Sequence, residues 1–88
     1  MDIRDLGDES VRRARGRLAR VEGQVRALQR MLDEGEDCDQ VLRQIGAASK
    51  ALRRVGVQLA VEGVEQCVTS PDRETDLERF RQAFVELS

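Results

Sequence analysis

Apolar residues recur along this chain at alternating steps of three and four, the spacing that marks one face of an α-helix. Three such stretches follow one another. Their members are Ala14, Leu18, Val21, Val25, Leu28 and Leu32; then Cys38, Val41, Leu42, Ile45, Ala48, Leu52, Val55 and Leu59; and finally Leu77, Phe80, Phe84 and Leu87. The pattern predicts three helices of about 25, 30 and 16 residues and no strand. The expected fold class is therefore all-α, with a three-helix protomer.

Polar residues and glycines suggest where the first helix begins and ends. Residues 1–10 read as a flexible N-terminal arm, and residues 11–88 read as a single helical domain. Asp8 or Ser10 could cap the first helix, because their side chains accept hydrogen bonds from free backbone N–H groups. Gly35 suits the left-handed position that ends a helix.

The next two helices carry similar signals. Asp37, with Gln40 three residues later, resembles a capping box. Ser70-Pro71 predicts an N-cap followed by the first turn of the third helix. Glycines inside the second helix each cost about 1 kcal/mol of helix propensity. They suggest close approach of neighbouring helices, and they are Gly46, Gly56 and Gly63.

The composition indicates that one protomer has too little core to stand alone. The chain has 88 residues, and only 2% of them are aromatic. Small helical proteins with so thin a core usually oligomerise. We therefore expect a helical bundle built from two or more chains. No apolar run is long enough to span a membrane, and the N-terminus lacks a signal peptide, so we expect a cytoplasmic protein.

Charge is distributed unevenly, although the net charge is only −2. Residues 11–30 contain seven arginines and a single acidic residue, Glu22. A second basic group follows on the next predicted helix and comprises Arg43, Lys50, Arg53 and Arg54. A solvated helix face would explain many such runs. The excess of arginine, which binds phosphate bidentately, favours DNA as the partner.

Two cysteines, Cys38 and Cys67, stand in a chain without histidine. A continuous helix between them would separate their sulfurs by about 43 Å, whereas a disulfide needs Cα atoms within about 7 Å. If the thiols act together, an antiparallel second chain must bring its Cys67 beside Cys38. The helix dipole favours a thiolate at Cys38, which we expect to be the attacking thiol, with Cys67 of the other chain as the resolving thiol.

Other uses of the cysteines remain open on this evidence. Each could be a small buried apolar residue, the commonest fate of a free cysteine. A structural zinc site normally needs four nitrogen or sulfur ligands, which two cysteines do not supply. Cu(I) accepts two or three soft ligands and could be held by two thiolates. With no histidine, phosphate-binding loop or nucleophile elbow, the chain is not expected to be an enzyme.

The run Arg17-Leu18-Ala19-Arg20-Val21-Glu22-Gly23-Gln24-Val25-Arg26 resembles the first-helix signature of the CsoR/RcnR family of bacterial repressors. The similarity continues through Arg30-Met31-Leu32, Cys38, Val41-Leu42-Arg43-Gln44-Ile45 and Cys67-Val68. It implies an antiparallel dimer, a tetramer made of two dimers, and an operator-binding surface of basic residues. Carried onto this chain, the main DNA contacts are Arg17 and Arg54, with Arg13, Arg20 and Lys50 as weaker candidates.

The resemblance also bears on the inducer. Copper sensors of this family place a histidine four residues before the second cysteine, a position held here by Gly63, and often a tyrosine where this chain has Asp37. The absence of histidine also argues against nickel, cobalt and formaldehyde. What remains is similar to the CstR-like branch, which senses reactive sulfur species.

The leading hypothesis is thus a repressor that releases operator DNA when a persulfide or polysulfide links Cys38 to Cys67 of another chain. It needs no cofactor. Cu(I) held by the same thiolates is the alternative inducer. A helical scaffold with incidental cysteines is a further alternative.

Overall fold

The computed structural model describes residues 1–87, and within them the chain is helical and contains no strand. A short 3-10 helix, η1 (Ile3–Leu6), precedes the α-helices α1 (Asp8–Glu34), α2 (Cys38–Cys67) and α3 (Arg73–Leu87). The three α-helices have 27, 30 and 15 residues, which confirms the predicted class and closely matches the predicted lengths. Ser88, the last residue of the predicted domain, lies outside the described residues.

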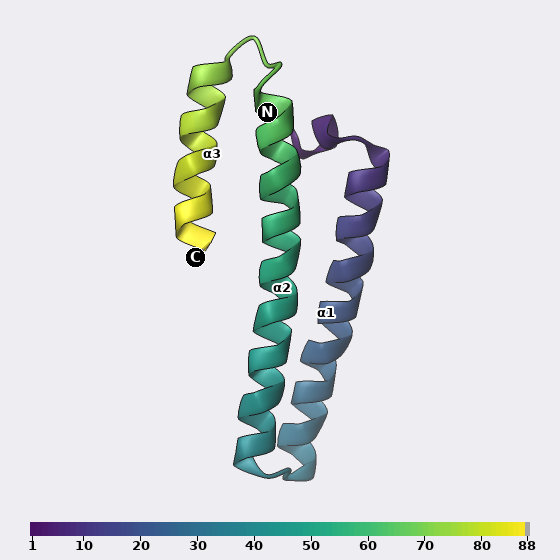
Figure 1. The fold of residues 1–88 in the computed structure, drawn as a ribbon. Coiled ribbons are helices and arrows are strands. Elements are labelled where there is room, and N and C mark those ends of the chain that lie inside the picture. The colour runs from purple at the N-terminus through teal and green to yellow at the C-terminus, as the bar shows by residue number, and fades with distance from the viewer. Residues whose placement is uncertain (88) are drawn as a thin grey trace.

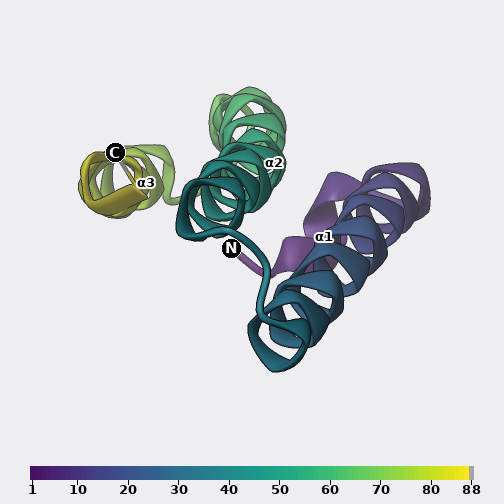
Figure 2. The ribbon, with the colours of Figure 1, turned by 90° about the horizontal axis from the view of Figure 1, so that it is seen from below.

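The helix α2 lies in the middle of the molecule. It forms an antiparallel hairpin with α1, and α3 folds back along its other side (Figure 1). Viewed from below, α2 separates the other two helices (Figure 2), and α3 packs on α2 without contacting α1. The protomer is thin and elongated, with extents of 54 × 25 × 13 Å. Every contact between two helices of the bundle therefore involves α2 or the short η1.

The N-terminal segment differs from the predicted arm of residues 1–10. Asp2 accepts hydrogen bonds from the backbone and side chain of Arg4, while the Asp5 carboxylate accepts one from the Asp2 N–H. These bonds close a capping box around η1, and the hydrogen bonds from Arg4 lower the pKa of the Asp2 carboxyl to about 2. The segment is structured because its own side chains satisfy its backbone donors.

The first helix also begins earlier than expected. Gly7, with φ of 97°, occupies the N-cap position without a side-chain hydrogen bond. Asp8 is therefore the first helical residue, and Ser10 lies in the first turn, where it is buried. The prediction that Asp8 or Ser10 caps this helix is wrong, because η1 leads the chain into α1 at a glycine.

The connection between α1 and α2 is mostly as predicted. Gly35 adopts the left-handed conformation, with φ of 76°, and the N–H groups of Gly35 and Glu36 both donate to the Met31 carbonyl at 3.1 Å. Asp37 occupies the N-cap position of α2, but its side chain makes no capping hydrogen bond. The predicted capping box with Gln40 is absent, because the Gln40 N–H instead donates to the backbone carbonyl of Asp37.

The start of α3 is shifted by a short turn. Ser70 and Pro71 precede α3, which begins at Arg73. The Ser70 hydroxyl accepts a hydrogen bond from the Asp72 N–H at 3.2 Å and donates one to Asp76 at 2.7 Å. Ser70 thus caps the turn before the helix, and the first helical backbone bond runs from the Asp76 N–H to the Asp72 carbonyl.

The core of a single protomer is small. Its buried apolar residues are Ala14, Val21, Ala48, Val55, Ala60 and Cys67. The apolar stripe predicted for the first helix is only partly buried, because Ala14 and Val21 are covered whereas Leu18, Val25 and Leu32 are 44–68% exposed. The protomer exposes 6814 Å², whereas a compact monomer of this mass exposes about 5,200 Å². Much of the apolar surface that the sequence encodes is therefore left uncovered by one chain.

Two glycine-to-alanine substitutions should act in opposite directions on stability. Gly35→Ala places a Cβ in a left-handed conformation and should lower the free energy of unfolding by about 1 kcal/mol. Gly23→Ala, inside α1 where a Cβ meets nothing within 4 Å, should raise it by up to about 1 kcal/mol. Urea unfolding at one fixed protein concentration measures both changes. Equal effects of the two substitutions would contradict this account of the hairpin turn.

Candidate functional site

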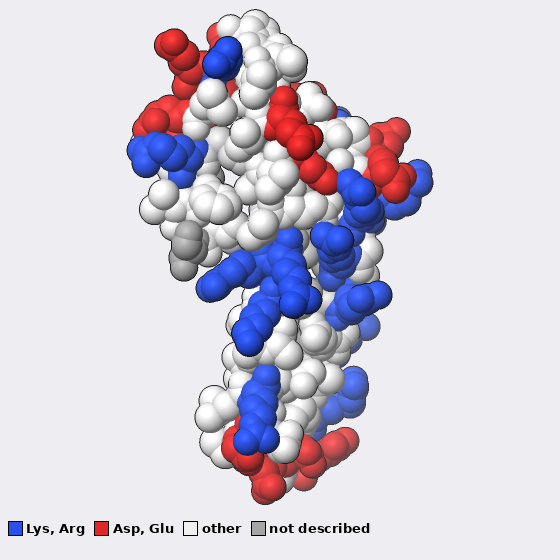
Figure 3. All heavy atoms as spheres, viewed as in Figure 1, with Lys and Arg blue, Asp and Glu red and all other residues white. Residues whose placement is uncertain are grey.

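Basic side chains from α1 and α2 converge on one groove. The groove has a volume of about 690 Å³ and is lined by Arg17, Arg20, Lys50, Ala51, Arg53, Arg54, Val57 and Gln58. Five of these residues are basic and none is acidic. Lys and Arg side chains form a band across the middle of the molecule, with Asp and Glu gathered toward its two ends (Figure 3). The groove is thus a concentration of positive charge on the surface of the molecule.

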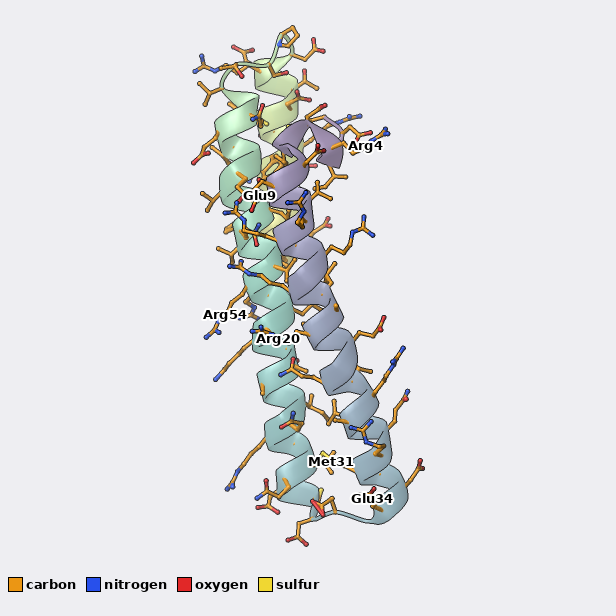
Figure 4. The ribbon with its side chains drawn as sticks, turned by 90° about the vertical axis from the view of Figure 1, so that its right-hand side faces the viewer. Arg4, Glu9, Arg20, Met31, Glu34 and Arg54 are labelled. Atoms are coloured by element: carbon orange, nitrogen blue, oxygen red, sulfur yellow. The ribbon has the colours of Figure 1, made fainter. Side chains whose placement is uncertain are left out.

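Polar contacts between α1 and α2 set the position of the groove. The Arg17 guanidinium donates to Gln58 Oε1, and Arg13 Nη2 pairs with Glu62 Oε1 at 2.7 Å. Gln58 also donates to the Ser10 carbonyl at 3.5 Å and to Glu62 at 3.3 Å. This network holds the two antiparallel helices in one register. Arg20 of α1 and Arg54 of α2 come from these neighbouring helices onto the same groove (Figure 4).

Four of the five predicted DNA-contact residues line this groove, namely Arg17, Arg20, Lys50 and Arg54. Arg13 lies outside it, and its charge is balanced by Glu62. Arg53 also lines the groove, although it is not among the contacts implied by the family resemblance. Its spacing of three residues from Lys50 could have indicated that both reach the same side of α2.

Most of the groove cations lack an acidic partner. Among the described residues, no carboxylate lies within 4.0 Å of the charged groups of Arg20, Lys50, Arg53 or Arg54. Elsewhere on the same helices, basic residues are paired along the helix, as in Arg12–Glu9, Arg26–Glu22 and Arg43–Asp39. Unpaired cations concentrated at one place attract phosphate more strongly than paired ones.

The two thiols lie at opposite ends of α2. Cys38 is its first residue and Cys67 its last, so an uninterrupted helix separates them. Helical rise puts them about 43 Å apart, which confirms that the thiols of one chain cannot meet. Cys38 is exposed, whereas Cys67 is 0% exposed. The two ends of α2 therefore offer thiols of very different accessibility.

Within one chain these thiols are not part of a larger donor cluster. No group of three or more Cys, Asp, Glu or His side chains in residues 1–87 is arranged to hold a metal ion. A Cβ at Gly63, four residues before Cys67, would overlap the ring of Phe80, so a side chain there would require that ring to move. Two thiolates supplied by two chains fit a soft cation of low coordination number such as Cu(I), and do not fit zinc.

Comparison with known proteins agrees with these features. The profile of a family described as metal-sensitive transcriptional repressor matches residues 10–87. The chain is 51% identical over 53 residues to the copper-sensing transcriptional repressor RicR of Mycobacterium tuberculosis (strain ATCC 25618 / H37Rv), covering 60% of this chain and 55% of that protein. It is 37% identical over 71 residues to the copper-sensing transcriptional repressor CsoR of Bacillus subtilis (strain 168), covering 81% of this chain and 67% of that protein.

The match therefore spans little more than half of the length of RicR. No solved structure matches the chain significantly. Among the described residues, no helix is both long enough and apolar enough to cross a membrane.

The difference in thiol exposure leads to a direct expectation. In the Cys67→Ala variant, Cys38 should react with N-ethylmaleimide at least about ten times faster than Cys67 does in Cys38→Ala, because a buried thiol reacts only when the structure opens. Quenched labelling followed by intact-protein mass spectrometry measures both rates. Both variants should label at one rate in 8 M urea, which serves as the control. Faster native labelling at Cys67 would refute the expectation.

Proposed function

Since this chain belongs to the metal-sensitive transcriptional repressor family, we propose that it represses transcription by binding operator DNA through the arginine groove. We further propose that a soft inducer, held between Cys38 of one chain and Cys67 of another, releases the DNA. The observation that carries the proposal is the groove itself, where five cations from two helices gather without an acidic residue. A repressor works beside its DNA, so we place the protein in the cytoplasm.

Assembly into a dimer and then a tetramer is part of this proposal. Exposed apolar residues on the first two helices include Leu18, Val25, Leu32, Leu42, Ile45 and Leu52. Packing a second chain against them would bury the surface that a thin protomer leaves exposed. An antiparallel arrangement would place the start of one α2 beside the end of the other, where Cys38 and Cys67 lie. Each added chain would also add one more basic groove for DNA.

Cu(I) is the inducer that we favour. Two relatives of this chain are named as copper-sensing repressors. Cu(I) accepts two soft sulfur ligands, so the chain's only two thiols form an adequate donor set. A ligand that binds one assembly state more tightly than another shifts the population toward that state. An inducer bridging two chains would therefore favour one arrangement of the subunits. If that arrangement binds DNA more weakly, the inducer lowers the DNA affinity.

A reactive sulfur species is the second candidate, and one observation supports it. The chain has two cysteines and no histidine, and position 63 is a glycine, so no third soft side-chain ligand is available to the site. A persulfide attacked by the Cys38 thiolate would transfer its outer sulfur to Cys38 and leave as a thiolate. The Cys67 thiolate of the other chain could then attack the inner sulfur and expel hydrosulfide, leaving a disulfide between the chains. This chemistry needs two thiols and no metal.

The DNA-binding half of the proposal can be tested through its salt dependence. Arg54→Ala removes one groove cation, so it should weaken binding to any duplex. It should also reduce the slope of log K against log salt by about 0.9 for each copy that contacts a phosphate. Fluorescence anisotropy with a labelled duplex at several salt concentrations measures this slope.

Arg43→Ala is the matched control, because Arg43 lies on the same helix outside the groove and pairs with Asp39. It should leave the slope nearly unchanged. Wild-type protein that shows no binding at low salt, or binding that does not weaken steeply as salt rises, would favour a scaffold role instead.

The inducer is tested on a duplex that the protein itself selects from a random pool. Under anaerobic conditions, Cu(I) should bind stoichiometrically and lower the DNA affinity at least about tenfold, a change of about 1.4 kcal/mol. Cys38→Ala and Cys67→Ala should each abolish the response, because either one removes half of the donor set. Serine variants at the same positions serve as a size-matched control.

The two candidate inducers can be distinguished by covalent crosslinking, because a reactive sulfur species would link two chains and Cu(I) would not. Polysulfide treatment should produce a linked dimer on non-reducing gels, with mass spectrometry showing a disulfide or added sulfur atoms between Cys38 and Cys67. If the crosslink releases DNA while Cu(I) has no effect, the sulfur hypothesis replaces the copper one. If neither treatment changes the DNA affinity, the assignment of the thiols as the sensing site is wrong.

A further inference from the structure

The contact between α2 and α3 is built from two matching pairs of residues. A Cβ added at Gly56 would lie 2.6 Å from a methyl carbon of Leu87, and one added at Gly63 would overlap the ring of Phe80. Each large side chain of α3 thus occupies a notch left by a glycine of α2. The absence of a side chain at these two positions allows α3 to lie directly against α2.

The two pairs fix the register of α3. Gly56 and Gly63 are seven residues apart on α2, and their partners are seven residues apart on α3 in the reverse order. The helices are therefore antiparallel, and a step toward the C-terminus of α2 matches an equal step toward the N-terminus of α3. A further step of four along the same face of α2 leads from Gly63 to Cys67, and the same step back along α3 leads from Phe80 to Asp76. The first turn of α3 therefore lies level with Cys67.

Other contacts hold the chain together at this level. Asp76 accepts a hydrogen bond from the Ser70 hydroxyl at 2.7 Å and pairs with the Met1 ammonium at 3.8 Å. Cys67 is 0% exposed, the lowest value among the buried apolar residues, although it belongs to the last turn of α2. The start of α3, the turn before it and the N-terminal residues Met1 and Asp5 therefore gather at this end of α2.

From this geometry we infer that α3 is a lid over Cys67, held shut by Phe80 in the notch at Gly63. The inference rests on the proposed function, in which Cys67 must meet an inducer that a second chain also holds. Because Cys38 is exposed and Cys67 is covered, the inducer would engage Cys38 first and reach Cys67 only when α3 moves. The response would therefore have two steps, binding at Cys38 and then opening of α3. While α3 is closed, the Cys67 thiol is protected from other thiol-reactive compounds.

The helix α3 has few contacts that would resist its opening. No residue of α3 is buried, and α2 is the only helix that α3 packs against, although Asp76 also pairs with the Met1 ammonium. Val85 is 61% exposed, and the ring of Phe80 is only half-buried. Segments with few buried apolar contacts open locally at a free energy well below that of global unfolding. A bridging inducer would stabilise the open position, since only that position offers it the Cys67 thiolate.

The test measures access to Cys67 in the Cys38→Ala background, with neither DNA nor inducer present. Phe80→Ala empties the notch and should raise the rate of N-ethylmaleimide labelling at Cys67 at least about tenfold, because labelling follows the population of the open form. Val85→Ala is the matched control on the exposed side of α3, and it should change the rate less than about twofold. A second pair of variants tests the same notch. Gly63→Ala crowds the notch and should also raise the labelling rate at Cys67, whereas Gly46→Ala, where a Cβ meets nothing within 4 Å, should leave that rate nearly unchanged.

The dependence of labelling on urea separates lid opening from unfolding. If only α3 opens, the labelling rate of Phe80→Ala should rise little at low urea, because local opening exposes little surface. An unchanged rate in Phe80→Ala would overturn the inference, and so would acceleration with the full urea dependence of global unfolding. The proposed function fails on different evidence, namely unaltered DNA affinity after treatment with an inducer.

Discussion

The unbroken helix α2 is the constraint on which the rest of this structure depends. Its 30 residues form a rigid rod with Cys38 at one end and Cys67 at the other. Its faces serve different neighbours, because Ala48 and Val55 are buried in the hairpin whereas Gly56 and Gly63 receive α3. Since a helix turns its side chains at fixed angles, these roles are separated by geometry alone. A break in α2 would disturb the seam with α1, the basic groove and the lid together.

A shortage of buried surface connects the fold to the function that we propose. One layer of three helices cannot cover its own leucines and valines, so the protomer is suited to pack against copies of itself. The same packing would solve the problem of the distant thiols, because only a second α2 can bring a Cys67 beside Cys38. Such an assembly would also carry one arginine groove on each chain, so that several grooves could bind DNA together. Stability, sensing and DNA binding would then all depend on one assembly.

The two thiols are unequal in the folded chain, and this inequality has consequences for sensing. Under the proposed function, an exposed Cys38 could meet an inducer directly, whereas a fully buried Cys67 could not. Chemistry that needs both is therefore coupled to a movement, and coupling of this kind is how binding at one place changes affinity at another. If the two thiols form one site, the absence of histidine leaves that site with two soft donors, which favours ligands that accept two thiolates.

Periodicity and residue type were sufficient to determine several features of this protein. The three helices, the glycine that ends α1 and the separation of the thiols all follow from local rules of helix geometry and helix termination. The predicted caps at Asp8 and Ser10 are absent because Gly7 holds the N-cap position, and the predicted capping box of Asp37 and Gln40 is absent because the Gln40 N–H donates to the Asp37 carbonyl. Only the tertiary structure decided which cations share a groove, that Arg13 is paired with Glu62, and that Phe80 fills the notch at Gly63. Those features depend on the register between helices, which is set by contacts among residues far apart in the chain, and local sequence patterns do not encode it.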